Sequence, residues 1–286
     1  MMTNIYIPQA TENQKRIAAG DISFVHYEEH DSLQKSRVVF NCYAISFVIN
    51  GEKAIFRPSN NTIVNTGEGI VIPQGNSIMA EHTLNEHKYS SVLIFFPAGI
   101  ALDFLSKHQL NTHVTTTSHP DYIKFRQTNY LAGYIKSLQA LIHEGQQLLY
   151  QLAVNKVEEL LLVLLQSYPK QLVALLQSNK PSTSLQLKNI VENNLFNNLT
   201  LDELAFLSHK SLASFKRDFE KAYHIAPGKY IRERKLELAR QQLSMGKNAS
   251  SLYLDFGYDN LSNFSSAFKK QFGVSPKQYQ LNTALI

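Results

Sequence analysis

The sequence of 286 residues contains a single cysteine, Cys42. One thiol group cannot form a disulfide bond within the chain, so the sequence lacks the cross-links that stabilise many small secreted domains. Cys42 lies in an apolar run, which favours a small buried residue over a redox switch. This cysteine usage is typical of proteins in a reducing compartment.

Long apolar runs are also missing. No run of apolar residues reaches the length of about 20 that a membrane-spanning helix needs. Residues 1–10 have neither the basic start nor the apolar core of a secretory signal peptide. We therefore expect a cytoplasmic protein that does not cross a membrane.

The motifs of several enzyme classes are absent as well. The sequence has no glycine-rich phosphate-binding loop and no G-x-S-x-G nucleophile motif. Glu81-His82 and Glu86-His87 lie near a predicted turn, but the H-x-H arrangement with a glutamate that holds a metal in cupin enzymes is missing. We expect ordinary surface or hydrogen-bonded histidines, no metal, no cofactor and no catalytic residue.

The excess of basic residues is confined to one part of the chain. Residues 1–180 contain 14 basic and 14 acidic residues, whereas residues 181–286 contain 14 basic and 9 acidic residues. The net charge of +5 therefore belongs to the C-terminal part. Such a distribution suits contact with phosphate groups of a nucleic acid. The alternative is a solvated charged surface with no partner.

Residues 17–104 have the pattern of short β-strands. A long β-prone run at 37–49 ends at Asn50-Gly51, which predicts a two-residue hairpin. Further short apolar segments alternate with turn residues such as Pro58-Ser59-Asn60-Asn61. This pattern is typical of a small barrel or jelly roll.

Residues 120–176 change to a helical pattern. Tyr122, Phe125, Tyr130 and Tyr134 begin a set of apolar residues that predicts one amphipathic helix, and residues 147–166 predict a second, leucine-rich helix. The second helix is apolar on more than one face. It must therefore bury one side on the barrel and another side elsewhere, unless it is a core helix buried entirely within its own domain.

A polar segment separates the two parts of the chain. Residues 177–184 contain a proline and no large apolar side chain, so we predict a linker there. The predicted domains are residues 1–176, with a helical part at about 120–176, and residues 185–286. A length of 286 residues also favours two domains.

The C-terminal part contains a repeated pattern. In each copy a short apolar helix is followed by a turn, a capping residue and a second helix with inward phenylalanines: Phe215 and Phe219 in the first copy, Phe264 and Phe268 in the second. Both copies then end in a Pro-x-x-Tyr segment. The repeat predicts two helix-turn-helix units.

These residues resemble the DNA-binding domain of the AraC/XylS family of bacterial transcription regulators. The second copy, FGYDNLSNFSSAFKKQFGVSPKQY, is similar to the family signature almost position by position. The first copy departs from it at His209 and His224, where the family usually has glycine. Histidine tolerates the left-handed backbone conformation, so we expect both turns to survive. The segment at 67–73 resembles a turn of the cupin-like sensor domain of many relatives. The expected fold is a two-domain α+β protein: an N-terminal cupin-like β-barrel with a helical dimerisation segment, and a C-terminal all-α domain.

The helix predicted between the two units is a spacer. Residues 227–243 would form a helix of about 25 Å. A rigid spacer of this length can hold two recognition helices about one DNA turn, roughly 34 Å, apart. One chain would then read two successive segments of the major groove.

The resemblance implies which side chains face DNA. On the first recognition helix these are Leu212, Ala213, Lys216 and Arg217; on the second they are Leu261, Ser262, Asn263, Ser265, Ser266, Lys269 and Lys270. Arg217 is the strongest candidate for base recognition, because a guanidinium can bind both acceptors of a guanine edge; the alternative is a phosphate contact. The second set is small and mostly uncharged, which favours backbone positioning over direct readout.

The resemblance further implies partners. They are double-stranded promoter DNA, RNA polymerase and, through the leucine-rich helix, a second copy of the chain in a homodimer. The residues expected at the dimer contact are Leu149, Leu152, Leu160, Leu161 and Leu164. The barrel would sense a small apolar ligand or a regulatory protein, and the chain would act as a transcription activator. The alternatives are a catalytic cupin fused to a DNA-binding domain and a regulator that acts only as a dimerisation partner.

Overall fold

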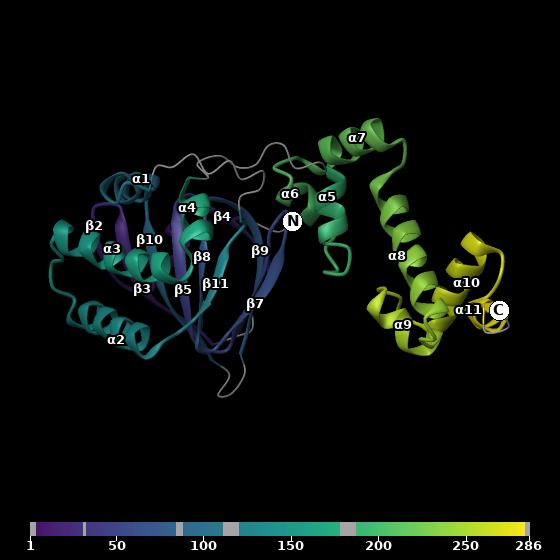
Figure 1. Ribbon diagram of the computed structural model, residues 1–286, viewed down its shortest axis with the longest axis horizontal. Helices are drawn as coiled ribbons and strands as arrows, with labels where there is room; N and C mark the ends of the chain where they lie inside the picture. The colour runs from purple at the N-terminus through teal and green to yellow at the C-terminus, as the bar shows by residue number, and fades with distance from the viewer. Residues whose placement is uncertain (1–3, 31–32, 84–87, 111–119, 178–186, 284–286) are drawn as a thin grey trace. The chain divides into compact units, whose positions relative to one another are not determined.

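The protein comprises two compact units, residues 1–184 and 185–286 (Figure 1). The computed structural model describes residues 4–30, 33–83, 88–110, 120–177 and 187–283. Of the predicted linker, only Gln177 lies within the described residues. None of the helices that these residues form is both long and apolar enough to cross a membrane.

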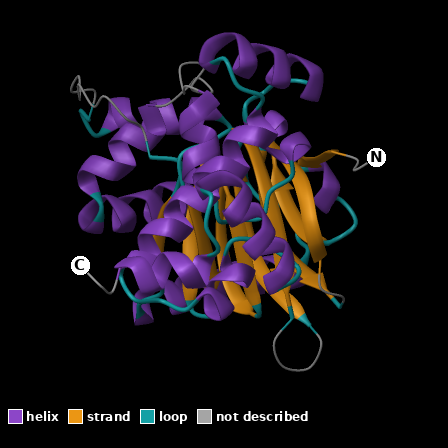
Figure 2. Ribbon diagram, turned by 90° about the vertical axis from the view of Figure 1, so that its right-hand side faces the viewer, coloured by secondary structure: helices purple, strands orange, loops and turns teal. Residues whose placement is uncertain are grey.

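The N-terminal unit contains two β-sheets (Figure 2). The larger sheet has six strands in the order β11-β8-β5-β10-β3-β2. Its strands are β2 (Lys15–Ala19), β3 (Ile22–Glu29), β5 (Tyr43–Asn50), β8 (Glu68–Ile72), β10 (Tyr89–Phe96) and β11 (Ile123–Arg126). All its neighbouring strands are antiparallel. Both faces of this sheet are covered, which explains why every residue of β10 is buried.

The second sheet has five strands in the order β1-β4-β9-β6-β7. They are β1 (Asn4–Ile7), β4 (Leu33–Phe40), β6 (Glu52–Phe56), β7 (Asn61–Asn65) and β9 (Gly75–His82), with a short 3-10 helix η1 (Gln9–Thr11) after β1. Only the pair of β1 and β4 is parallel. One core cluster contains residues of both sheets, including Val25, Val38 and Phe95.

Helices cover the outer face of the six-stranded sheet. They are α1 (Ala98–Lys107), α2 (Asn129–Glu144), α3 (Tyr150–Ser167) and α4 (Pro169–Gln177). The second core cluster of the unit joins side chains of these helices, such as Leu138 and Leu160, to sheet residues such as Phe24 and Phe47. The unit therefore has three layers: sheet, sheet and helices.

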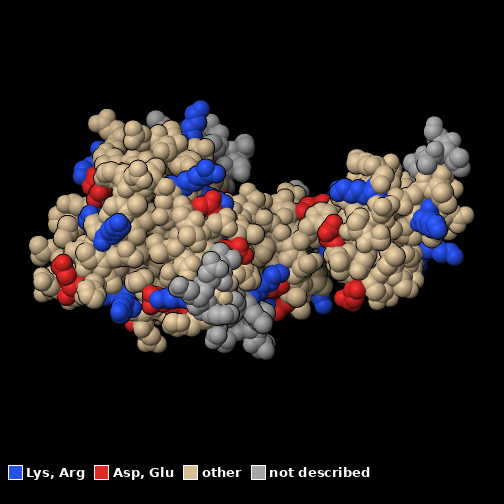
Figure 3. All heavy atoms as spheres, turned by 90° about the horizontal axis from the view of Figure 1, so that it is seen from below, with Lys and Arg blue, Asp and Glu red and all other residues tan. Residues whose placement is uncertain are grey.

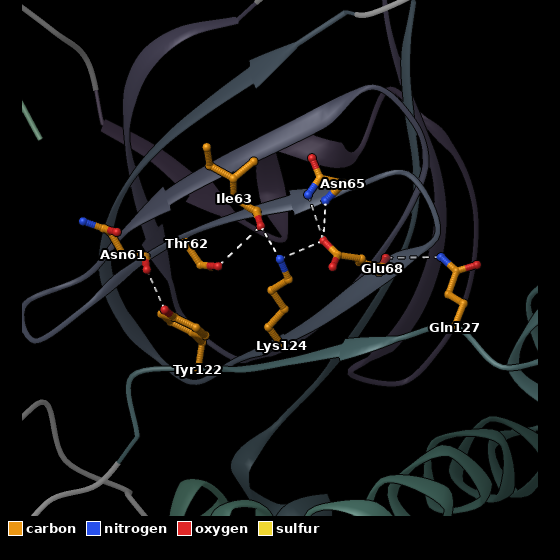
Figure 4. A network of polar contacts seen from close by, with 8 residues as sticks. All are labelled: Asn61, Thr62, Ile63, Asn65, Glu68, Tyr122, Lys124 and Gln127. Carbon is orange, nitrogen blue, oxygen red and sulfur yellow. Dashed lines mark hydrogen bonds and ion pairs between the residues drawn. The ribbon is translucent and has the colours of Figure 1, made fainter.

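Among the described strands, no continuous ladder closes the two sheets into a barrel. Along one side, β11 of the larger sheet reaches β7 of the smaller sheet through side chains (Figure 4). Tyr122 Oη donates to the carbonyl oxygen of Asn61 at 2.7 Å, and Lys124 Nζ donates to that of Ile63 at 2.7 Å. Lys124 Nζ also lies 2.8 Å from Glu68 Oε2. The predicted fold class is confirmed, and the cupin-like barrel is an approximation to an open sandwich.

Two local predictions for this unit are wrong. Asn50-Gly51 does not join a hairpin, because β5 and β6 belong to different sheets. Gly51 has a φ of +90°, and a Cβ atom there would lie 2.6 Å from the carbonyl oxygen of His82. The glycine thus allows a tight change of sheet. Residues 122–126 are not the start of a helix either, since Ile123–Arg126 pairs with β8 as β11.

The C-terminal unit is helical among its described residues. Its helices are α5 (Leu187–Asn193), α6 (Leu201–Leu207), α7 (Leu212–Tyr223), α8 (Pro227–Ser244), α9 (Ala249–Asp255), α10 (Leu261–Phe272) and α11 (Pro276–Thr283). Pro227 opens α8, as the predicted spacer requires. The 18 residues of α8 give it a length of about 27 Å.

Candidate nucleic-acid interface

Two helix-turn-helix units form the candidate interface, α6 with α7 and α9 with α10. Their turns have the same backbone conformation, because His209 and Gly257 both have positive φ angles, +55° and +77°. The segments after α7 and α10 also match: His224 has a φ of +56° and Gly273 a φ of +81°. The two histidines therefore occupy left-handed positions, as expected for residues that replace glycine.

The recognition helices α7 and α10 begin at equivalent caps. Ser211 Oγ accepts a hydrogen bond from the backbone N–H of Ser214 at 3.2 Å, and Asn260 Oδ1 accepts one from that of Asn263 at 2.8 Å. These bonds satisfy N–H groups that have no partner within the helix. The preceding helix α6 has a capping box between Thr200 and Glu203.

The inward faces of both recognition helices consist of phenylalanines. Phe215, Phe219, Phe264 and Phe268 are fully buried. Phe268 packs against Phe272 and Tyr279, and Phe219 packs against Tyr223 and Tyr230. The predicted repeat is thus present in the packing as well as in the sequence.

The outward face of α7 carries the residues that sequence reasoning assigned to DNA. Ala213, Lys216 and Arg217 are exposed, and Leu212 is half-buried. The Arg217 side chain is 72% exposed, and its Nε lies 3.4 Å from Asp218 Oδ1. The principal partner of Asp218 is Lys210, whose Nζ lies 2.9 Å from Oδ2 and whose hydrogen bond lowers the pKa of this carboxyl group. Arg217 is therefore exposed and makes only a long contact with Asp218.

The outward face of α10 is small and polar. Leu261, Ser262, Asn263, Ser266, Lys269 and Lys270 are exposed, and Ser265 is half-buried. Leu261 is accessible and does not pack under the turn. Basic and acidic side chains are mixed on the face of the C-terminal unit that Figure 3 shows. On that face the basic side chains do not form one uninterrupted patch.

Two sets of contacts hold the helix-turn-helix units in place. Glu192 of α5 accepts hydrogen bonds from Tyr230 Oη and from Arg234 Nε, the latter at 3.0 and 3.2 Å, and so ties α5 to α8. The segment between α5 and α6 contacts the second helix-turn-helix unit. The Phe196 ring packs edge-on against Phe256, 5.4 Å between centroids. Sequence reasoning missed both, because neither set of partners is close in the chain.

The N-terminal unit contains a cavity between its two sheets. Its volume is about 230 Å³. The walls are mostly apolar, with Val38, Leu93 and Phe95 among the lining residues, and Lys53 and Glu81 are the charged side chains in the lining. The alternating pattern of the strands predicts apolar residues between the sheets, but no sequence signal places a lysine there.

The predicted dimer residues of α3 fall into two groups. Leu149 and Leu152 are exposed, at 74% and 40%. Leu160, Leu161 and Leu164 are buried in the core beneath α3, so their assignment to a dimer contact is wrong. Leu162 is an exposed leucine at that end of the helix.

The described residues include no group of three or more histidine, cysteine, aspartate or glutamate side chains that could hold a metal ion. Glu81 pairs with Lys53 at 3.1 Å. Glu86, His87, His113 and His119 lie outside the described residues. Cys42 is buried, and burial raises the pKa of its thiol to about 12.

Comparisons with known proteins match both units. A family model described as the ExsA N-terminal regulatory domain matches residues 43–175, and one described as a helix-turn-helix domain matches residues 204–282. The regulator ExsA of Pseudomonas aeruginosa is 30% identical over 169 residues, 56% of this chain and 57% of that protein. The chain therefore spans little more than half the length of this relative.

A second relative is covered more fully. The HTH-type transcriptional activator AarP of Providencia stuartii is 31% identical over 93 residues, 32% of this chain and 69% of that protein. Among solved structures, ToxT from Vibrio cholerae aligns with 91% of this chain and 98% of its own, at 12% identity and a TM-score of 0.42. The match to AarP and the two family models show that the chain belongs to the AraC family of transcriptional regulators.

Proposed function

We propose that this protein activates transcription by binding promoter DNA with α7 and α10 in successive segments of the major groove. The strongest support is the duplicated geometry. Two capped recognition helices have buried phenylalanines and exposed polar faces, and a helix of about 27 Å joins them. Membership of the AraC family supports the assignment. The protein acts by binding and not by catalysis, and it acts in the cytoplasm, where promoter DNA is found.

The test is a selection of binding sites from random double-stranded DNA with the full-length chain. We expect an enriched site with two short sequence blocks about one helical turn apart, and an affinity that falls steeply as salt rises. A charge-reversed chain, with Lys216→Glu and Arg217→Glu, should enrich no site. Enrichment of no sequence by the natural chain at low salt would overturn the proposal.

We propose that the N-terminal unit regulates this binding. The match of residues 43–175 to an N-terminal regulatory domain supports a sensory role, and the cavity between the sheets supports a small apolar ligand over a protein partner. The exposed leucines of α3 support contact with a second copy. Activation further requires contact with RNA polymerase, which family membership supports.

A further inference from the structure

A pair of charged side chains in the cavity wall restricts what the cavity can hold. Lys53 Nζ and Glu81 Oε1 are 3.1 Å apart, and these side chains are 3% and 9% exposed. They come from neighbouring strands, since Lys53 of β6 is the register partner of Glu81 of β9. The ion pair is therefore a fixed part of the wall.

Neutral groups surround this pair. Lys53 Nζ donates to Ser46 Oγ at 3.4 Å and lies 5.4 Å from the centre of the Tyr89 ring. Tyr27, on the larger sheet, contacts Glu81; burial and the negative charge of Glu81 raise the pKa of the Tyr27 hydroxyl. Burial alone would lower the pKa of Lys53, but Tyr89 and Glu81 raise it above its usual value. The 3.1 Å separation of Lys53 Nζ and Glu81 Oε1 makes Glu81 the counter-ion of Lys53.

Most of the remaining lining is apolar and comes from both sheets. Ile7, Val38, Phe40, Ile72, Leu93 and Phe95 contribute side chains to it. A guest must therefore be mainly hydrocarbon, because the wall offers hydrogen-bonding partners only around the ion pair and at a few small hydroxyls.

The charge of the guest follows from the ion pair. A carboxylate next to this pair would add a second negative charge beside Glu81, and an ammonium group would add a second positive charge beside Lys53. Either leaves one buried charge without a partner, which is strongly unfavourable. A hydroxyl or carbonyl group can instead hydrogen-bond to the pair and leave it intact.

We propose that the cavity between the two sheets binds an uncharged molecule with a hydrocarbon body and a single hydroxyl or carbonyl head, which hydrogen-bonds to the Lys53–Glu81 pair. This inference rests on the sensory role proposed above for the N-terminal unit. It names the ligand class for that role. A buried lysine without a counter-ion would instead favour an acidic ligand.

The experiment compares three ligands that differ only in the head group. Calorimetric titration of the full-length chain with decanol, decanoate and decylamine separates the neutral, anionic and cationic heads. We expect decanol to bind at least about tenfold more tightly than either charged analogue. Equal or tighter binding of decanoate or decylamine would overturn the proposal, as would binding of none of the three.

Variants locate the site. Ala44→Leu adds carbon atoms to the cavity wall and should abolish decanol binding while circular dichroism stays unchanged. Glu81→Gln removes the counter-ion of Lys53 and should raise the affinity for decanoate at least about tenfold, at the expense of decanol selectivity. If Glu81→Gln does not fold, the double change Lys53→Met with Glu81→Gln should weaken decanol binding without creating a preference for acid. Retention of decanol binding in Ala44→Leu would place the ligand elsewhere and overturn the proposal.

Titration and DNA selection are independent measurements on one preparation. Decanol binding without any selected DNA site would overturn the proposed regulator and leave the cavity assignment standing. A selected DNA site without decanol binding would overturn the cavity assignment and leave the proposed regulator standing.

Discussion

Single residues decide how the first recognition helix reads DNA. Arg217 and Lys216 are exposed cations on its outward face, and Asp218 is engaged mainly by Lys210. Lys210 therefore neutralises the carboxylate that would otherwise hold Arg217. The position of Lys210 in the turn before α7 makes this possible.

Replacing Arg217 should cost sequence-specific affinity. We expect Arg217→Ala to weaken binding to the selected site by about 1–3 kcal/mol and to relax the preference at one base pair, because a bidentate contact is lost. The measurement is a gel-shift titration against the site and its single-base variants.

Lys229 provides the matched control. Its side chain is 65% exposed and lies 3.7 Å from Glu233, so it resembles Arg217 in exposure and pairing but lies on α8. Lys229→Ala should change affinity equally for all sequences or not at all. A uniform loss in Arg217→Ala would instead show that Arg217 contacts a phosphate.

His224 tests the cost of a left-handed residue that is not glycine. Its φ is +56°, and the equivalent residue of the second unit is Gly273 at +81°. We expect His224→Gly to raise the free energy of unfolding by up to about 1 kcal/mol and Gly273→Ala to lower it by about 1 kcal/mol. Urea unfolding of the full-length chain measures both. A lower free energy of unfolding in His224→Gly, or a higher one in Gly273→Ala, would contradict the shared geometry.

At the level of elements, the segment between α5 and α6 fixes the second helix-turn-helix unit against the first. The Phe196 ring packs on Phe256, and a Cβ atom at Gly257 would lie 3.3 Å from Asn198 Oδ1. This segment therefore touches the turn that precedes the second recognition helix. It is a second connection between the two helix-turn-helix units, in addition to α8.

Loss of the Phe196–Phe256 contact should weaken DNA binding only when both helix-turn-helix units are bound to DNA. We expect Phe196→Ala to weaken binding to a DNA with both sequence blocks by up to about tenfold, because an aromatic pair contributes about 0.5–1.5 kcal/mol. Binding to DNA with one block should stay unchanged. Met245→Ala, at an exposed apolar residue outside this contact, is the control. An equal loss on both DNAs would show that Phe196 only stabilises the fold.

Elements also show where sequence reasoning succeeds. The two helix-turn-helix units were predictable because caps, turn residues and the phenylalanine period all lie within about 20 residues of each other. The pairing of β5 with β8 and β10 was not, because Asn50-Gly51 has the local chemistry of a hairpin whether or not the next strand stays in the sheet. The apolar residues of 122–126 suit a helix or a strand. They form a strand because they pair with the edge of β8. The Lys53–Glu81 pair depends on strand register, which no local pattern reveals.

At the level of the whole molecule, the two units divide the work. The basic excess belongs to residues 181–286, and the described cavity belongs to the neutral N-terminal unit. Contact with a second copy would give one complex two pairs of recognition helices. The exposed part of α3 is the surface proposed for this contact.

A charge on that surface should separate the two copies. We expect Leu152→Glu to convert a dimer into a monomer, because a carboxylate would be buried at the contact. Sedimentation equilibrium measures the state, and Gln151→Glu, next to it on the exposed side of α3, is the control for added charge. A natural chain that is monomeric at all concentrations would contradict the proposal.

The side-chain closure between β11 and β7 has a kinetic consequence. Among the described strands β7 has a backbone ladder only with β6, whereas β5 is paired on both edges. Tyr122 and Lys124 satisfy the carbonyl groups of Asn61 and Ile63, and the N–H groups of Asn61 and Asn65 donate to the side chains of Asn60 and Glu68 in exposed hydrogen bonds. Such exposed side-chain acceptors protect an amide less than a second backbone ladder does. Outward amides of β7 should therefore exchange with deuterium much faster than those of β5, so that one margin of the sandwich opens to solvent while its centre stays protected.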